Sequence, residues 1–207
     1  MLMKISLTNA GKRFNRDWIF RHLTTELISG SSYAIIGPNG SGKSTLLQVL
    51  SGSMQQSEGN CQWWFHEKEI LQENIYSSVS LCAPYLEVVE EMTLLEFFDF
   101  HQKFKPFIPG FDKHAIIEIV GLEKAKDKQI RYYSSGMKQR VKLAQCIFSD
   151  TAIVLLDEPC TNLDTAGINL YHNLVKDHCQ KRLVVVSSND EMEYGFCEHH
   201  LLISDYK

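Results

Sequence analysis

The chain has 207 residues, 44% of them hydrophobic, which is enough to bury one sizeable core in a single domain spanning residues 1–207. A formal net charge of -4, from 21 Lys and Arg against 25 Asp and Glu, argues against the broad positive field that a nucleic-acid partner requires. No cysteine pair has C-x-x-C spacing, and no apolar run approaches the roughly 20 residues of a membrane span. We therefore expect reduced thiols and no membrane-spanning segment.

The first 31 residues predict a small antiparallel layer. Apolar and polar residues alternate over residues 3–7 and again over 18–27, a pattern typical of strands with one buried face. Trp63 and Trp64 fit the same layer, because neighbouring residues of a strand point to opposite faces. We expect this layer near the edge of a larger sheet.

Five short runs of β-branched and aliphatic residues predict that larger sheet. Most of the runs are separated by stretches with helical spacing, and such alternation favours a mainly parallel α/β sheet. The runs cover residues 33–36, 78–82, 153–156, 183–186 and 201–203.

Capping residues mark three helices. Thr93 and Glu96 have the spacing of a capping box, and Asp112 and Asp164 each precede a segment with helical spacing. Together with the apolar periodicity, these signals predict a mainly helical subdomain over residues 93–140, inserted into the connectivity of the sheet.

The most specific motif is G-x-x-x-x-G-K-[ST], which lies between an apolar run and a helix that we expect to open at Leu46. Gly40 and Gly42 allow the backbone N–H groups to converge on one centre, where the helix adds its positive end. A polyphosphate is the expected occupant, with Lys43 near its β- and γ-phosphates and the Ser44 hydroxyl in a Mg²⁺ shell. A glycine-rich turn without a ligand is the disfavoured alternative. The predicted binding residues are Gly37, Pro38, Asn39, Gly40, Ser41, Gly42, Lys43, Ser44 and Thr45.

Two acids, Asp157 and Glu158, follow the apolar run 153–156 directly. Open α/β sheets bind ligands at the carboxyl ends of their strands, so we expect both carboxylates beside the glycine-rich loop. Asp157 would hold Mg²⁺ through water, and Glu158 would polarise or deprotonate the attacking water. A solvated turn is the alternative, and the presence of the glycine-rich motif disfavours it.

Residues 133–140, Tyr-Ser-Ser-Gly-Met-Lys-Gln-Arg, resemble the L-S-G-G-Q signature motif of ABC-type ATPases. The order of motifs over nearly the whole chain is similar to that of the nucleotide-binding subunit of an ABC transporter. The resemblance implies an α/β P-loop NTPase fold with a mainly parallel sheet, an N-terminal antiparallel β layer and an inserted helical subdomain.

The resemblance also implies ATP and Mg²⁺ as cofactors and a second copy of the chain as a partner. In such an ATP-sandwich dimer, Ser134 and the Gly136 amide would contact the γ-phosphate bound to the other protomer, and Asp164 would touch the partner's loop. Phe14 would stack on adenine, with Trp18 as the alternative. Separate transmembrane permease subunits would be further partners, which implies a cytoplasmic subunit, peripheral on the inner face of the membrane.

Three features depart from the family pattern. Asn189 stands in place of the family's histidine, and an amide forms hydrogen bonds but cannot carry a proton. Ala83 or Pro84 stands where the family has a metal-touching glutamine, and the signature segment carries two substitutions. Because Glu158 is retained, we expect an active ATPase with slowed hydrolysis, in which Asn189 contributes to catalysis alongside Glu158 and Lys43.

The leading interpretation is a subunit that powers an ABC transporter. Its signature segment resembles those of export-type systems more than those of importers. The alternative is a soluble ABC ATPase that acts as an assembly or regulatory module for a cytosolic partner; a small-molecule kinase is disfavoured by the signature segment. By analogy, residues 85–107 would contain the docking region for the membrane partner. Phe97, Phe100 and Phe104 have helical spacing there, which favours a core stripe over a partner surface.

Overall fold

The computed structural model describes residues 2–207, and their strands form two sheets. All pairings in the five-stranded sheet are parallel, and all pairings in the four-stranded sheet are antiparallel. The parallel sheet has the order β6 (Val79–Cys82), β7 (Ile153–Asp157), β8 (Leu183–Ser188), β3 (Ser32–Ile36) and β9 (His199–Leu202). The antiparallel sheet has the order β2 (Asp17–Ile28), β1 (Met3–Phe14), β4 (Glu58–Phe65) and β5 (Lys68–Ile70). Both predicted layers are thus confirmed.

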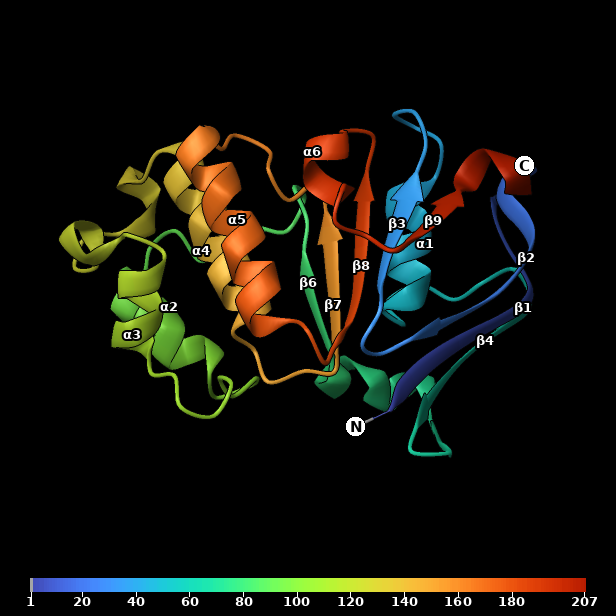
Figure 1. Ribbon diagram of the computed structural model, residues 1–207, viewed down its shortest axis with the longest axis horizontal. Helices are drawn as coiled ribbons and strands as arrows, with labels where there is room; N and C mark the ends of the chain where they lie inside the picture. The colour runs from blue at the N-terminus through green and yellow to red at the C-terminus, as the bar shows by residue number, and fades with distance from the viewer. Residues whose placement is uncertain (1) are drawn as a thin grey trace.

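Helix α1 (Lys43–Leu50) lies between the two sheets (Figure 1). Its apolar residues, Leu46, Leu47 and Leu50 among them, pack in one buried cluster with the inner faces of both sheets. The helix begins three residues before the expected Leu46, because the N–H of Leu46 already donates to the Gly42 carbonyl at 2.9 Å. Lys43 and Ser44 therefore belong to the first helical turn, where backbone N–H groups are free to bind a ligand.

The opposite face of the parallel sheet is covered by α4 (Ser135–Ile147) and α5 (Thr165–His178) (Figure 1). Beyond α4, at the left of Figure 1, lie α2 (Leu94–His101) and α3 (Lys113–Ile119). A second buried cluster joins these helices to the sheet. The remaining helical segments are η1 (Gln72–Ser78), η2 (Glu123–Ala125), η3 (Ile130–Tyr132), α6 (Glu191–Tyr194) and η4 (Ile203–Tyr206).

The capping residues marked in the sequence begin their helices as predicted. Thr93, Asp112 and Asp164 each accept a backbone N–H from three residues ahead, at 3.3, 2.8 and 2.8 Å. Glu96 completes the capping box by accepting the Thr93 N–H at 2.8 Å. These contacts satisfy donors that would otherwise lack a partner in the first turn.

The expected core stripe of phenylalanines is wrong for two of its three members. Phe97 is 4% exposed, whereas Phe100 is 42% and Phe104 69% exposed, and the last two pack on each other with ring centroids 5.1 Å apart. Helix α2 ends at His101, so Phe104 lies beyond it, and Phe98 takes the inward position instead. The exposed pair is therefore part of the surface.

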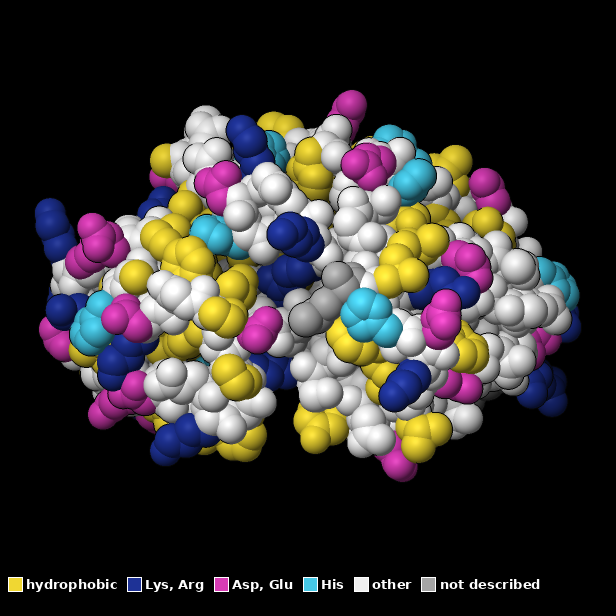
Figure 2. Space-filling view, turned by 60° about the horizontal axis from the view of Figure 1, so that its bottom comes forward, with side chains coloured by type: hydrophobic (Ala, Val, Ile, Leu, Met, Phe, Trp, Pro, Cys, Tyr) yellow, Lys and Arg dark blue, Asp and Glu magenta, His cyan; other side chains and the backbone are white. Residues whose placement is uncertain are grey.

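Within residues 2–207, no helix is both long enough and apolar enough to span a membrane. On the face shown in Figure 2, Lys and Arg side chains are interspersed with Asp and Glu. This mixed distribution agrees with the small formal net charge of -4.

Candidate functional site

The glycine-rich loop joins β3 to α1 at the carboxyl edge of the parallel sheet. Gly40 and Gly42 have φ angles of +76° and +106°, in the region that side-chain-bearing residues rarely adopt. A Cβ atom at Gly42 would also lie only 2.3 Å from the Cγ2 atom of Ile19. Glycine is therefore required at position 42 by both backbone conformation and space.

Lys43 is 5% exposed, and its ammonium group lies inside this loop. Its Nζ atom donates to the carbonyl oxygens of Gly37 and Pro38, at 2.8 and 3.3 Å. The buried hydroxyl of Ser41 has no hydrogen-bond partner within residues 2–207. A cation, an unpaired hydroxyl and the free N–H groups of a helix start fit an oxygen-rich anion such as a polyphosphate.

Asp157 ends β7 and is 2% exposed. Its Oδ1 atom accepts a hydrogen bond from the Ser187 hydroxyl of β8 at 2.7 Å, which orients the carboxylate. Ser44 supplies a hydroxyl at the same sheet edge. A hydroxyl and a carboxylate oxygen are ligands that Mg²⁺ accepts while it keeps several waters, so the donor set of Ser44 and Asp157 fits that ion.

Glu158 has a left-handed backbone, with φ of +45°. Its N–H donates to the Ser187 carbonyl at 2.9 Å, and its own carbonyl accepts from the Thr161 N–H at 3.2 Å. A non-glycine residue in this conformation costs about 1–3 kcal/mol, and such strain is concentrated at functional sites. The backbone therefore changes direction sharply at Glu158, directly after β7 ends.

A cavity of about 210 Å³ brings the loop and Glu158 together. Both features had been predicted from the sequence to lie near each other. The cavity is lined by Ile19, Asn39, Gly40, Gly42, Lys43, Ser44, Thr45 and Glu158. Of these, Ile19 was not singled out in the sequence; the only signal was the alternation of β2, in which its neighbour Phe20 is fully buried on the other face.

The signature segment lines a different cavity, of about 690 Å³. Ser134 is the N-cap of α4 and accepts the Met137 N–H at 3.2 Å, while Asp164 is the N-cap of α5. Both helices begin at this cavity, together with Gly136. We call this the signature cavity, and the cavity beside Glu158 the P-loop cavity. The two cavities share no lining residue, so the glycine-rich loop and the signature segment of one chain line separate cavities.

The turn after Glu158 is stabilised by two residues to which the sequence patterns assign no role there. The Gln139 side chain of α4 donates to the Pro159 carbonyl at 2.7 Å, and the Glu193 carboxylate of α6 accepts the Cys160 N–H at 2.7 Å. Burial raises the pKa of the Glu193 carboxyl, while its hydrogen bonds with the Ser188 side chain and with the Cys160 N–H oppose this increase. Contacts between distant segments of this kind have no local sequence signal.

The predicted adenine-stacking residue lies outside both cavities. Phe14 is 46% exposed at the end of β1, and the Lys12 ammonium lies 5.3 Å from its ring centroid. The Trp18 ring has guanidinium groups of Arg13 and Arg21 at 5.4 and 4.4 Å from its centroid. Phe14 is therefore the more accessible of the two rings.

Two of the three departures from the family pattern lie on loops that follow strands of the parallel sheet. Asn189 is exposed, one residue beyond the end of β8. Ala83 follows β6 and is fully buried, whereas Pro84 is exposed. Neither residue carries a side-chain amide, so the glutamine is missing at both possible positions.

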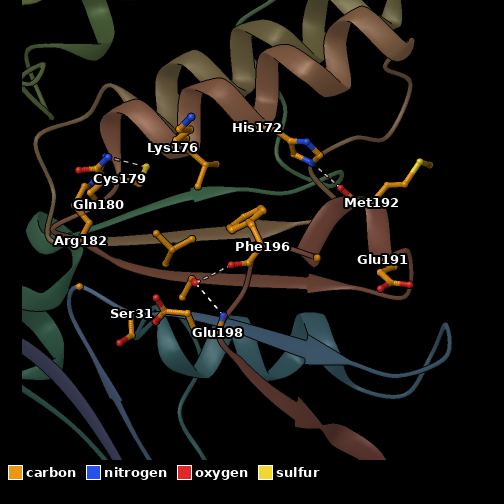
Figure 3. A pocket seen from close by; sticks show the side chains of 15 residues that line it. Ser31, His172, Lys176, Cys179, Gln180, Arg182, Glu191, Met192, Phe196 and Glu198 are labelled. Carbon is orange, nitrogen blue, oxygen red and sulfur yellow. Dashed lines mark hydrogen bonds between the residues drawn. The ribbon is translucent and has the colours of Figure 1, made fainter.

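A further cavity of about 660 Å³ lies between α5, β8 and α6, away from the residues marked by the sequence (Figure 3). His172 and Phe196 face it, and the Nε2 atom of His172 is 2.7 Å from the Met192 carbonyl oxygen. Burial raises the pKa of the Cys179 thiol there to about 12, so this group stays protonated and unreactive. This cavity is larger than the one beside Glu158, but none of the residues predicted to bind nucleotide or metal lines it.

A glycine-rich loop that enters α1, beside a strand ending in two acids, defines a P-loop nucleotide-binding protein. A family model described as ABC transporter matches residues 20–161. This match covers more than half of the chain, and the chain therefore belongs to the ABC transporter family and is an ATPase of that family.

Individual relatives agree with this assignment. The chain is 30% identical to the uncharacterized ABC transporter ATP-binding protein YhcH of Bacillus subtilis, over 91% of this chain and 63% of that protein. It is also 30% identical to the cytochrome c biogenesis ATP-binding export protein CcmA 2 of Cupriavidus metallidurans, over 85% of this chain and 84% of that protein. The dimeric structure of a bacterial ABC transporter cassette matches with a TM-score of 0.80 and 20% identity, over 96% of this chain and 94% of that one.

Proposed function

We propose that two copies of this chain clamp ATP between them and hydrolyse it to power an ABC transporter. The observation that carries the proposal is the separation of the P-loop cavity from the signature cavity on one chain, with no lining residue in common. In a dimer with two-fold symmetry, every contact between the two chains occurs twice. The P-loop of each chain would therefore face the signature segment of the other. The relative that is a dimeric cassette in its own structure supports this arrangement.

Within one protomer, Lys43 and the loop N–H groups would bind the phosphates, and Phe14 would support the base. Bound Mg²⁺, held by Ser44 and by Asp157 through water, would neutralise charge on the phosphates. Glu158 would accept the proton of the attacking water. Asn189 would only form hydrogen bonds to the γ-phosphate or the water, because an amide carries no proton.

From the other protomer, Ser134 and the Gly136 N–H would contact the γ-phosphate at the start of α4. A helix N-terminus is suited to an anion because its free N–H groups and its dipole both point there. A Cβ atom at Gly136 would lie 3.0 Å from the Asn162 carbonyl oxygen, so a larger residue would crowd this approach. Asp164, at the N-cap of α5, would touch the partner's P-loop.

Transmembrane permease subunits are the proposed membrane partners, with the chain peripheral on the inner, cytoplasmic face. The word "export" in the name of the CcmA 2 relative supports an export-type system. Residues 85–104 carry several large exposed apolar side chains, and such side chains mark contact surfaces when they gather. They are Tyr85, Leu86, Val89, Phe100 and Phe104. Hydrophobic side chains reach the surface at the helical end of the molecule, at the left of Figure 2.

Phe100 and Phe104 of this surface would belong to a helical subdomain of residues 93–140 within one domain of residues 1–207, and the other three residues would lie just before that subdomain. Helices α2 and α3 and the short η2 and η3 lie within these bounds. The boundary at residue 140 falls inside α4, which continues to Ile147 and packs against β6. Motion of the subdomain would therefore move the signature end of α4 relative to the sheet.

Complementation between two inactive variants tests the clamp. Lys43→Ala disables the P-loop and Gly136→Asp disables the signature segment, so each variant alone should lack ATPase activity. In a mixed dimer, the intact P-loop of one chain faces the intact signature of the other. Half of the dimers are mixed and each keeps one of two sites, so an equal mixture should recover about a quarter of wild-type activity.

Each variant at the same total concentration is the control for the mixture. A mixture that stays as inactive as the separate variants would mean that each chain completes its own site, which contradicts the clamp.

A further inference from the structure

The peptide group between Pro159 and Cys160 is held from both sides by buried side chains. The Nε2 atom of Gln139, on α4, donates to the Pro159 carbonyl at 2.7 Å. The Oε1 atom of Glu193, on α6, accepts the Cys160 N–H at 2.7 Å. Gln139 is 4% exposed and Glu193 is 5% exposed, so breaking either hydrogen bond would leave a buried polar group without that partner. The two contacts therefore fix the orientation of one peptide group.

This peptide group lies at the centre of the turn that begins at Glu158. The Glu158 carbonyl accepts the Thr161 N–H at 3.2 Å, so Pro159 and Cys160 are the two central residues of the turn. Proline fixes its own φ angle, but it leaves the peptide group that follows it free to rotate. The orientation of that peptide group is therefore set by the two side chains that hold it.

The strained backbone of Glu158 depends on such support. Its φ angle is +45°, and a conformation of this kind persists only where the surrounding structure over-determines it. On one side, the Glu158 N–H donates to the Ser187 carbonyl of β8 at 2.9 Å. On the other side lies the held peptide group. If that group were released, Glu158 could relax to an ordinary φ angle, and its side chain would leave the P-loop cavity that it lines.

The two side chains come from elements that also serve other parts of the site. The Glu193 carbonyl accepts the hydroxyl of Tyr171, a fully buried residue of α5, at 2.8 Å, which holds α6 in place. Gln139 lies in α4, whose N-cap is Ser134. Under the proposed function, Ser134 contacts the nucleotide of the partner, whereas Gln139 contacts the turn of its own chain. One helix would thus contribute to both sites of a dimer.

We propose that Gln139 and Glu193 are positioning residues that hold Glu158 of their own chain in place for hydrolysis. The inference rests on the proposed function, in which Glu158 accepts the proton of the attacking water. Neither positioning residue lines the P-loop cavity or the signature cavity, so neither would touch the nucleotide. Loss of either contact should therefore lower kcat and leave the KM for ATP unchanged.

Mixed dimers of the Lys43→Ala and Gly136→Asp chains test this role. The one working site of such a dimer uses the P-loop and Glu158 of the Gly136→Asp chain and the signature segment of the Lys43→Ala chain. Gln139→Met keeps the length of the side chain but removes the amide. Placed in the Gly136→Asp chain, it should lower kcat about tenfold, the equivalent of about 1.4 kcal/mol. Placed in the Lys43→Ala chain, whose own Glu158 is idle, it should have a much smaller effect.

Two substitutions of Glu193 in the Gly136→Asp chain provide a conservative pair. Glu193→Gln keeps an oxygen that can accept the Cys160 N–H, so it should retain most of the activity of the mixture. Glu193→Met removes the acceptor and should lower kcat as Gln139→Met does. Gln55→Met is the matched control, because Gln55 is an exposed glutamine beyond the end of α1.

An equal loss of activity with Gln139→Met in either chain would overturn the proposal, because it would indicate damage to α4 as a whole. An unchanged kcat in the Gly136→Asp chain would overturn it too, as would a Glu193→Gln chain no more active than Glu193→Met. If the Lys43→Ala and Gly136→Asp chains without further substitutions recover no activity together, the proposed function itself is overturned.

Discussion

Lys43→Ala is expected to weaken ATP binding at least about 100-fold, which corresponds to a loss of about 2.7 kcal/mol. The Lys43 ammonium is almost fully buried and donates only to two carbonyls of its own loop, so it is placed to exchange these contacts for phosphate oxygens. Hydrogen bonds from a charged donor contribute about 1.5–3 kcal/mol each, and the lysine would form them with two phosphates. Isothermal titration calorimetry with ATP measures the loss.

The loop itself should survive this substitution. Gly40 and Gly42 set the curl of the backbone independently of the lysine side chain, and thermal unfolding checks that the variant is folded. Lys68→Ala provides a control, since Lys68 is an exposed lysine on β5, in the antiparallel sheet. A Lys43→Ala variant that binds ATP within threefold of the wild type would show that the nucleotide does not use this loop.

Glu158→Gln is expected to slow hydrolysis by about 10²–10⁴-fold while ATP still binds. Glutamine has the shape of glutamate but cannot accept the proton of the attacking water, and the strained turn around it keeps the backbone hydrogen bonds with Ser187 and Thr161. Because hydrolysis would no longer reopen the clamp, an ATP-bound dimer should accumulate. Single-turnover kinetics measure the rate of hydrolysis, and size-exclusion chromatography in the presence of ATP measures the fraction of dimer.

The matched control is Glu87→Gln, which neutralises an exposed glutamate on the loop between β6 and α2. It should hydrolyse ATP at the wild-type rate and show no stable dimer. Wild-type turnover in Glu158→Gln would remove Glu158 from the mechanism and shift the role of the base to another group.

Much of the fold could be predicted because its signals are local. Each parallel strand contains a short run of apolar residues, such as residues 153–156 before Asp157, and β7 and β8 are buried along their whole length, as expected for strands covered on both faces. Thr93, Asp112 and Asp164 cap helices through contacts that span only three residues. The glycine-rich loop combines a motif with its flanking strand and helix, so its geometry was also open to prediction.

The remaining features depend on contacts between distant segments. Ile19 comes from β2 and reaches the P-loop cavity only through the packing of that strand against Gly42. Phe104 is exposed because α2 ends before it. Apolar spacing along one segment says nothing about where the helix will end or which loop will fold against it.

The central claim is that ATP is hydrolysed between two copies of the chain, and steady-state ATPase activity measured against protein concentration tests it most directly. With Mg²⁺ present, the specific activity should rise with concentration and level off as dimers form, while Glu158→Gln stays inactive throughout. A specific activity that is constant from the lowest concentration, in a protein shown to be monomeric there by light scattering, would contradict the account.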